Sequence, residues 1–220
     1  MGASLAVIIL AGGTSRRMGP NKPLQQLAGQ TMLAQTVMTA LSISPNVVVV
    51  AGNPVQEAAY RSEVPDSVTL VHDKIPERGP LIGLYTGLEN VDSEYAAVLP
   101  CDSPFVIREV VLSLHRVAKG ADAAVPVWSD GRIEPLHSVF CVRSARRAAV
   151  EALKAEMDTI REMIQQMDKV RLVSVDKIKE LDSGLLTFFN VNTPEDLEKA
   201  RTIIDQVGSY GSASAGPDRK

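Results

Sequence analysis

Apolar and polar residues alternate along this chain in blocks whose lengths suit buried strands and one-sided helices. Three unbroken apolar runs, at 5–10, 47–50 and 95–99, and a mostly apolar run at 68–71 have the length of a buried strand. Between them, apolar residues recur at helical spacing, as at Leu33, Val37 and Leu41. Four alternations of strand and helix are typical of a parallel sheet wound by right-handed crossovers. The pattern therefore predicts an α/β fold.

The second half of the chain predicts a mixed sheet. The expected elements are a helix at 108–118, strands at 121–127 and 134–140, helices at 145–154 and 159–167, and a strand at 170–175. Asp130-Gly131 is a strong turn signal between the first two of these strands, which favours an antiparallel pair. Thr193, Pro194 and Glu195 are typical of a capped entry into a final helix, which we expect to end near Val207.

Composition is that of one globular domain. The chain has 220 residues, of which 45% are hydrophobic and 22% charged, and this length suits one α/β core better than two thin ones. We expect a single domain over residues 1–207. The stretch 208–220 is rich in Gly, Ser and Ala with little to bury, so we expect a disordered tail there.

Charge and cysteine usage exclude several classes of protein. The net charge of −3 argues against a general affinity for nucleic acid. No apolar run approaches the ~20 residues of a membrane helix, and the N-terminus lacks a secretion-signal pattern, so we expect a cytoplasmic protein with no membrane partner. Cys101 and Cys141 are far apart, and the histidines are scattered, so neither a zinc site nor a nucleophilic triad is indicated.

A glycine-rich basic stretch follows the first strand. It spans residues 10–19 and continues to Lys22. Adjacent Gly12 and Gly13 allow close approach of a ligand, and freed backbone amides can point at phosphate oxygens. With Arg17 and Lys22 nearby, the stretch predicts a polyphosphate cradle, although it matches neither G-x-x-x-x-G-K-[ST] nor G-x-G-x-x-G. The alternative is an ordinary strand-to-helix turn with solvated basic residues.

Polar residues follow several of the predicted strands. Ligands of parallel sheets bind beyond the carboxyl ends of the strands, and Gly12, Asn53, Asp73 and Asp102 all occupy such positions. Asp102 is a candidate ligand of a hard cation that also binds substrate phosphates, and Asp73 reaches the same edge. The alternative is that both aspartates only cap helices or stabilise turns. Asn53 can likewise cap a helix.

The remaining candidate residues are expected to have structural roles. Cys101 is expected to be a packed thiol, because no histidine is linked to it by a motif. His137 lies on a predicted strand and is expected to be half-buried rather than a general base. Arg143, Arg146 and Arg147 are expected to form a solvated basic helix face.

The motifs together resemble those of a known family. They are Leu10-Ala11-Gly12-Gly13 with Arg17-Met18-Gly19 and Lys22-Pro23, then Gly79-Pro80-Leu81-Ile82-Gly83, Pro100-Cys101-Asp102-Ser103-Pro104-Phe105, Glu134-Pro135-Leu136 and Asn190-Val191-Asn192-Thr193-Pro194-Glu195-Asp196-Leu197. Over roughly residues 5 to 200 the chain resembles MobA-type molybdenum cofactor guanylyltransferases. The first motif is shared by many nucleotidyltransferases. Ala11-Gly12-Gly13 and the late Asn-Val-Asn-Thr-Pro motif resemble the guanylyltransferases more than the cytidylyl- and uridylyltransferases.

The resemblance implies a Rossmann-like three-layer αβα nucleotidyltransferase fold with a mostly parallel, mixed sheet. It implies transfer of GMP from GTP to the phosphate of molybdopterin, with Mg²⁺ as cofactor and release of pyrophosphate. Direct attack of a phosphate oxygen on the α-phosphorus needs no protein nucleophile, which agrees with the missing triad. A transient molybdoenzyme or chaperone partner is compatible with this reading.

The resemblance also implies roles for individual residues. It assigns GTP binding to Leu10, Ala11, Gly12, Gly13, Lys22, Asp73 and Asp102, less firmly to Asn53, metal binding to Asp102, and molybdopterin binding to Asn190 and Asn192. Arg17, Lys22 and Asp102 are the implied catalytic residues, because Arg17, Lys22 and the metal ion bound by Asp102 would offset charge that builds on the leaving group. Two alternatives stay open: a cytidylyltransferase of the same fold acting on molybdopterin or another phosphorylated small molecule, and a GTP-binding adaptor without turnover.

Overall fold

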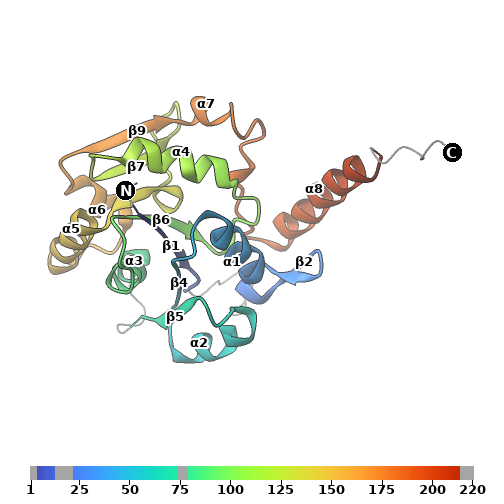
Figure 1. Cartoon of the computed structure of the whole chain (residues 1–220), viewed down its shortest axis with the longest axis horizontal. Helices are drawn as coiled ribbons and strands as arrows, with labels where there is room; N and C mark the ends of the chain where they lie inside the picture. Colours follow the sequence, from blue (N-terminus) through green and yellow to red (C-terminus); the bar gives the residue numbers. More distant parts are fainter. Residues whose placement is uncertain (1–3, 13–21, 74–78, 214–220) are drawn as a thin grey trace.

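A computed structural model describes residues 4–12, 22–73 and 79–213 of the chain (Figure 1). Within them a seven-stranded sheet has the order β5-β4-β1-β6-β8-β7-β9. Its strands are β1 (Leu5–Leu10), β4 (Val47–Ala51), β5 (Thr69–His72), β6 (Tyr95–Pro100), β7 (Ala123–Val127), β8 (Val139–Cys141) and β9 (Val170–Ser174). Only β8 pairs antiparallel with its neighbours β6 and β7. The sheet is therefore mixed and mostly parallel, as the sequence predicts.

Helices cover both faces of the sheet. They are α1 (Met32–Ile43), α2 (Pro54–Tyr60), α3 (Pro80–Glu89), α4 (Arg108–Ala118), α5 (Val142–Lys154), α6 (Ile160–Gln165), α7 (Val175–Ile178) and α8 (Pro194–Ala213). Residues of α1 and α4 pack in one core with Val7 and Ile9, whereas α3, α5 and α6 pack in a second core with Ala6 and Ile8. Because β1 is buried on both faces, its sequence is apolar without alternation. This is a three-layer αβα fold.

Caps at the helix starts follow the sequence signals. The Thr31 hydroxyl accepts a hydrogen bond from the Ala34 N–H at 3.1 Å, and Asn53 Oδ1 accepts one from the Gln56 N–H at 2.9 Å. Thr159 forms a capping box at the start of α6. The Thr193 hydroxyl accepts from the Asp196 N–H at 3.2 Å. These side chains satisfy amides that the first helical turn leaves free.

The predicted strand at 134–140 is wrong in its first half. Pro135–His137 form a 3-10 helix, η3, and pairing begins only with β8 at Val139. Proline has no N–H to donate to a ladder, and the His137 N–H instead donates to the Glu134 carbonyl at 3.2 Å. The apolar stretch 185–189 similarly holds a 3-10 helix, η4 (Leu186–Phe188). Both short helices lie near the edge of the sheet where β7 ends.

Three further features go beyond the sequence pattern. A small hairpin of β2 (Gln26–Leu27) and β3 (Gln30–Thr31) follows the 3-10 helix η1 (Lys22–Leu24), and η2 (Arg61–Glu63) extends α2. The hairpin, α1 and the start of α8 share an apolar cluster around Leu27 and Val191. Figure 1 shows α8 leaving the body beside β2. The final helix was expected to end near Val207, whereas α8 continues to Ala213.

No helix in the described part of the chain is long and apolar enough to cross a membrane.

Replacing Gly87 with alanine is expected to destabilise the fold. A Cβ at this position of α3 would overlap the Ile8 side chain of β1, and overpacking of this kind costs ~1–3 kcal/mol. Gly83→Ala is the matched control on the same helix, because its Cβ would meet Leu10 Cδ2 at an ordinary 3.5 Å. The control should be neutral or more stable by up to ~1 kcal/mol. Urea unfolding measures both, and equal stability of the two variants would contradict the packing described.

Candidate active site

The carboxyl ends of the parallel strands bring the candidate residues to one edge of the sheet. In the strand register, Leu10 lies beside both Val50 and Pro100, and Ala51 lies beside His72. The segments that follow these strand ends carry Gly12, Asn53, Asp73 and Asp102. β8 runs the opposite way, so the residues before it, and not those after it, reach this edge. We call this edge the carboxyl rim.

Lys22 joins two remote segments at the carboxyl rim. Its ammonium group donates a hydrogen bond to Asp102 Oδ2 and another, of 2.8 Å, to Asn192 Oδ1. The side chains of Lys22 and Asp102 are only 12% and 20% exposed. The Asp102 carbonyl accepts a hydrogen bond from the Val191 N–H at 2.9 Å, which holds residues 190–192 against the end of β6. The structure thus places a lysine, a carboxylate and an amide in direct contact.

Next to the Lys22–Asp102 contact, Ser103, Asn190 and His137 form a second, buried group of contacts. The Ser103 hydroxyl donates to Asn190 Oδ1 at 2.5 Å, and His137 Nε2 lies 3.1 Å from the same hydroxyl oxygen. Ser103 and His137 are 1% and 3% exposed. With the hydroxyl hydrogen on Asn190, the His137 Nε2–H is the donor to Ser103. His137 is therefore fully buried in a 3-10 helix, which corrects the expectation of a half-buried strand residue.

Burial keeps His137 neutral. It lowers the pKa of this imidazole from 6.5 to about 4, because the charged form loses hydration, and Nδ1 has no hydrogen-bond partner among the described residues. At neutral pH the ring therefore holds Ser103 and Asn190 in place without carrying charge. This geometry suits a supporting role better than proton transfer.

Stability should depend on pH through His137. Since the folded-state pKa lies below the unfolded value, the unfolded chain takes up this proton first, and the free energy of unfolding falls as pH drops from about 6.5 to about 4. At pH 5 the loss is ~2 kcal/mol. His137→Gln should lack this contribution. Urea unfolding of both proteins at pH 7 and pH 5 measures the difference, and identical pH dependence in the two would contradict the buried, neutral imidazole.

The start of the glycine-rich stretch is fixed by the sheet. The Tyr60 hydroxyl, buried so that its pKa is raised, donates to the Ala11 carbonyl at 3.1 Å, and the Ala11 N–H donates to Val50 at 2.9 Å. A Cβ on Gly12 would lie 3.0 Å from the backbone of Gly52, so glycine is required for this close approach. Residues 13–21, which include Gly13 and Arg17, lie outside the described residues.

Asp73 follows β5 at the carboxyl rim and lies beside the end of β4 and Gly83 of α3. Its N–H donates to the Ala51 carbonyl at 3.0 Å, and its Oδ1 is buried with no hydrogen-bond partner among the described residues. Burial raises the pKa of this carboxyl, while Thr86 and His72 oppose the shift. A buried carboxylate oxygen without a donor can accept a hydrogen bond from a ligand hydroxyl or amine. The side-chain oxygen of Asn53, by contrast, accepts the capping hydrogen bond at the start of α2. Its amide nitrogen is therefore the group available to a ligand.

Cys101 is a packed thiol, as expected. It is 7% exposed, and burial raises its thiol pKa. Its carbonyl accepts a hydrogen bond from Thr36 at 3.3 Å, and its N–H donates to Leu10 at 3.1 Å. Cys101 thus ties the end of β6 to β1 and α1 and positions the neighbouring Asp102.

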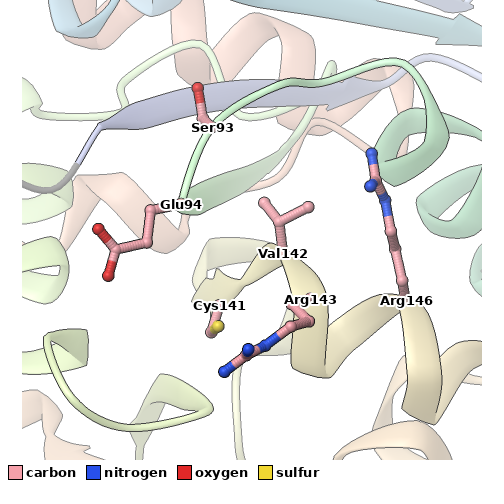
Figure 2. Close-up of a pocket in the computed structure, with 6 residues that line it drawn as sticks. All are labelled: Ser93, Glu94, Cys141, Val142, Arg143 and Arg146. Carbon is pink, nitrogen blue, oxygen red and sulfur yellow. The ribbon is translucent and has the colours of Figure 1, made fainter.

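A hollow at the opposite edge of the sheet is separate from these residues. Figure 2 shows its lining: Ser93, Glu94, Cys141, Val142, Arg143 and Arg146. They lie where β6 begins and β8 ends. Arg146 was expected on a solvated face, but its guanidinium donates to the carbonyls of Leu88 at 2.8 Å and Val91 at 2.9 Å. It satisfies carbonyls that the end of α3 leaves free.

Ser103, Tyr60 and His137 are supporting residues; the sequence pattern predicted no role for Ser103 or Tyr60 and predicted His137 only as a half-buried strand residue. Ser103 could have been found from its place between Asp102 and Pro104. Tyr60 and His137 give no such signal, because their partners are 49 and 34 residues away along the chain.

A family model described as the MobA-like NTP transferase domain matches residues 7–170. A probable molybdenum cofactor guanylyltransferase of Methanothermobacter thermautotrophicus is 34% identical over 197 residues, which cover 87% of this chain and 96% of that protein. The molybdenum cofactor guanylyltransferase of Desulfosudis oleivorans is 32% identical over 202 residues, covering 90% and 94%.

A solved structure has the same fold. The molybdopterin-guanine dinucleotide biosynthesis protein A of Archaeoglobus fulgidus superposes with a TM-score of 0.79 at 26% sequence identity, covering 91% of this chain and 99% of the other.

Proposed function

The chain belongs to the MobA-like NTP transferase family, and on that premise we propose that it transfers the guanylyl group of GTP to the phosphate of molybdopterin, releasing pyrophosphate. The observation that supports this most is the contact of Lys22 with Asp102 and Asn192 at the carboxyl rim. This contact places the Lys22 ammonium, the Asp102 carboxylate and the Asn192 side chain next to one another. Donor and acceptor phosphates must also meet at one point.

The proposed reaction needs positioning and charge neutralisation. An oxygen of the acceptor phosphate attacks the α-phosphorus of GTP, a new P–O bond forms, and the bond to the β-phosphate breaks. Lys22 holds the triphosphate and offsets the charge that develops on the departing pyrophosphate. Its ammonium has three donors, so it can keep Asn192 while it binds a phosphate oxygen. Arg17, which lies outside the described residues, is proposed to offset part of the same charge.

Asp102 is the proposed ligand of a magnesium ion. Magnesium binds one or two protein carboxylates and completes its shell with substrate phosphates and water. Asp102 fits this pattern, since its Oδ1 makes no hydrogen bond to the described residues, and no cluster of three or more acidic, His or Cys residues competes among them. When bound, the ion would neutralise phosphate charge beside Lys22.

The other residues are proposed to define the two ligands. Leu10, Ala11, Gly12 and Gly13 are proposed to line the guanine and phosphates. Asp73 is proposed to accept a hydrogen bond from the nucleoside, because its Oδ1 is buried and without a partner among the described residues. Asn190 and Asn192 are proposed to face the pterin, and Asn53 is a weaker candidate whose amide nitrogen alone is free of the α2 cap.

A nucleotide panel tests the proposed function. Purified protein with molybdopterin and Mg²⁺ is given GTP, CTP, ATP or UTP in turn, and released pyrophosphate is measured. Release of pyrophosphate with GTP, and not with the other three nucleotides, supports guanylyl transfer. Release with CTP alone would identify a cytidylyltransferase, and GTP binding by calorimetry without release would identify an adaptor; either result contradicts the proposal.

A further inference from the structure

A tight hairpin after β7 carries the chain's only tryptophan, Trp128. The Trp128 N–H donates to the Arg132 carbonyl at 2.8 Å, and the Gly131 N–H donates back to Trp128 at 2.9 Å. The indole N–H donates to Glu134 Oε1 at 2.5 Å. The Arg132 guanidinium lies 5.1 Å from the centre of the indole ring. The half-buried ring is therefore fixed in orientation, with a planar cation over one face.

Aromatic side chains connect Trp128 to the Lys22–Asp102 contact. Phe188 meets Trp128 edge-on with ring centres 5.7 Å apart, and His137 meets Phe188 edge-on at 5.3 Å. His137 contacts Ser103, the residue after Asp102. β7 is antiparallel to β8, which is antiparallel to β6, so β7 ends at the carboxyl rim as β6 does. A chain of side-chain contacts thus runs from Ser103, beside Asp102, through His137 and Phe188 to Trp128.

These contacts lie on the opposite side of β6 from the strands that precede the proposed nucleotide residues. The sheet order puts β1, β4 and β5, which carry Gly12 and Asp73, to one side of β6, and β8, β7 and β9 to the other. With the nucleotide on the first side, the second side is left for the acceptor. Asn190 follows two residues after Phe188, so the same segment connects these aromatic side chains to Asn190 and Asn192, the proposed molybdopterin residues.

We propose that Trp128 and Arg132 form the outer part of the acceptor subsite and take the flat ring system of the pterin. This inference rests on the proposed function and adds residues that recognise its acceptor. An indole held by Phe188 and Glu134 offers a rigid stacking surface, and a guanidinium stacks on planar rings as well. Arg132 is free to rearrange, since its side chain is 61% exposed and its ion pair with Asp130, at 3.6 Å, is solvated.

Kinetics separate recognition of the pterin from mere support of the fold. Trp128→Leu is expected to raise the KM for molybdopterin ~10-fold, the scale of losing one ring stack, with kcat and the KM for GTP within about 2-fold. Arg132→Ala is expected to raise the same KM a few-fold, and Trp128→Phe should retain most of the affinity. Arg143→Ala, at the opposite edge of the sheet, is the matched control for Arg132 and should change neither KM.

An unchanged KM for molybdopterin in folded Trp128→Leu and Arg132→Ala would overturn the inference, and so would equal increases in both KM values. Should Trp128→Leu fail to fold, Arg132→Ala carries the kinetic test, because its side chain is exposed.

Fluorescence gives a readout that needs no turnover. Because Trp128 is the only tryptophan, quenching of the emission by added molybdopterin, without GTP and after correction for absorption by the pterin, reports binding close to the indole ring. Quenching together with guanylyl transfer supports both proposals. Quenching without transfer supports the subsite and contradicts the proposed function. Guanylyl transfer with unchanged emission contradicts the subsite alone.

Discussion

Replacing Asp102 with asparagine is expected to lower the rate of guanylyl transfer by ~10²-fold or more, the scale observed when one preorganised charge partner is removed. Asparagine has nearly the same shape, and the backbone contact of residue 102 with Val191 does not depend on the side chain. The substitution therefore removes the negative charge that would bind magnesium and leaves the fold in place. Pyrophosphate release at saturating GTP and molybdopterin measures the effect.

Asp176→Asn is the matched control for this variant. Asp176 is also paired with a lysine, Lys179 at 2.7 Å, but its side chain is 68% exposed and lies in α7. It should retain full activity. Near-normal turnover in folded Asp102→Asn would contradict the role proposed for this carboxylate.

Replacing Lys22 with alanine is expected to lower turnover by a similar ~10²-fold or more. The ammonium group is removed from the point where Asp102 and Asn192 meet, so nothing there offsets the charge on the departing pyrophosphate. Lys179→Ala removes an exposed lysine that is paired with Asp176 and serves as the control. Initial rates of pyrophosphate release measure both. Activity of Lys22→Ala equal to that of Lys179→Ala would exclude the proposed role.

The double variant Lys22→Ala with Asp102→Asn sharpens both predictions. Because the two side chains are proposed to act on the same phosphates, their losses should be less than multiplicative. Fully multiplicative losses would indicate that Lys22 and Asp102 act at independent steps.

The carboxyl rim could be predicted from the sequence because strand ends carry strong local signals. The apolar run 95–99 ends at Pro100, and the parallel order of neighbouring strands then places Asp102 at the same edge as Gly12 and Asp73. The caps at Thr31 and Asn53 are also local, since each side chain bonds an amide three residues on. The spacing of apolar residues and the identity of capping residues are enough to predict strand ends and helix starts.

Contacts between remote segments could not be derived from local pattern. Lys22 and Asn192 are separated by 170 positions, and Ser103 and Asn190 by 87. The 3-10 helix at Pro135–His137 was missed because the turn signal at Asp130-Gly131 favoured a strand directly after it, whereas Pro135 removes a ladder donor. The insertion of β8 between β6 and β7 is likewise a property of the whole sheet. The roles of the site residues stay predictions.

A crystal structure with GTP and Mg²⁺ bound would show where the triphosphate and the metal ion bind. We expect the triphosphate at the carboxyl rim, with Lys22 Nζ on its phosphate oxygens and an Asp102 carboxylate oxygen on the metal ion. A nucleotide bound elsewhere, or Asp102 turned away from the ion, would contradict this expectation.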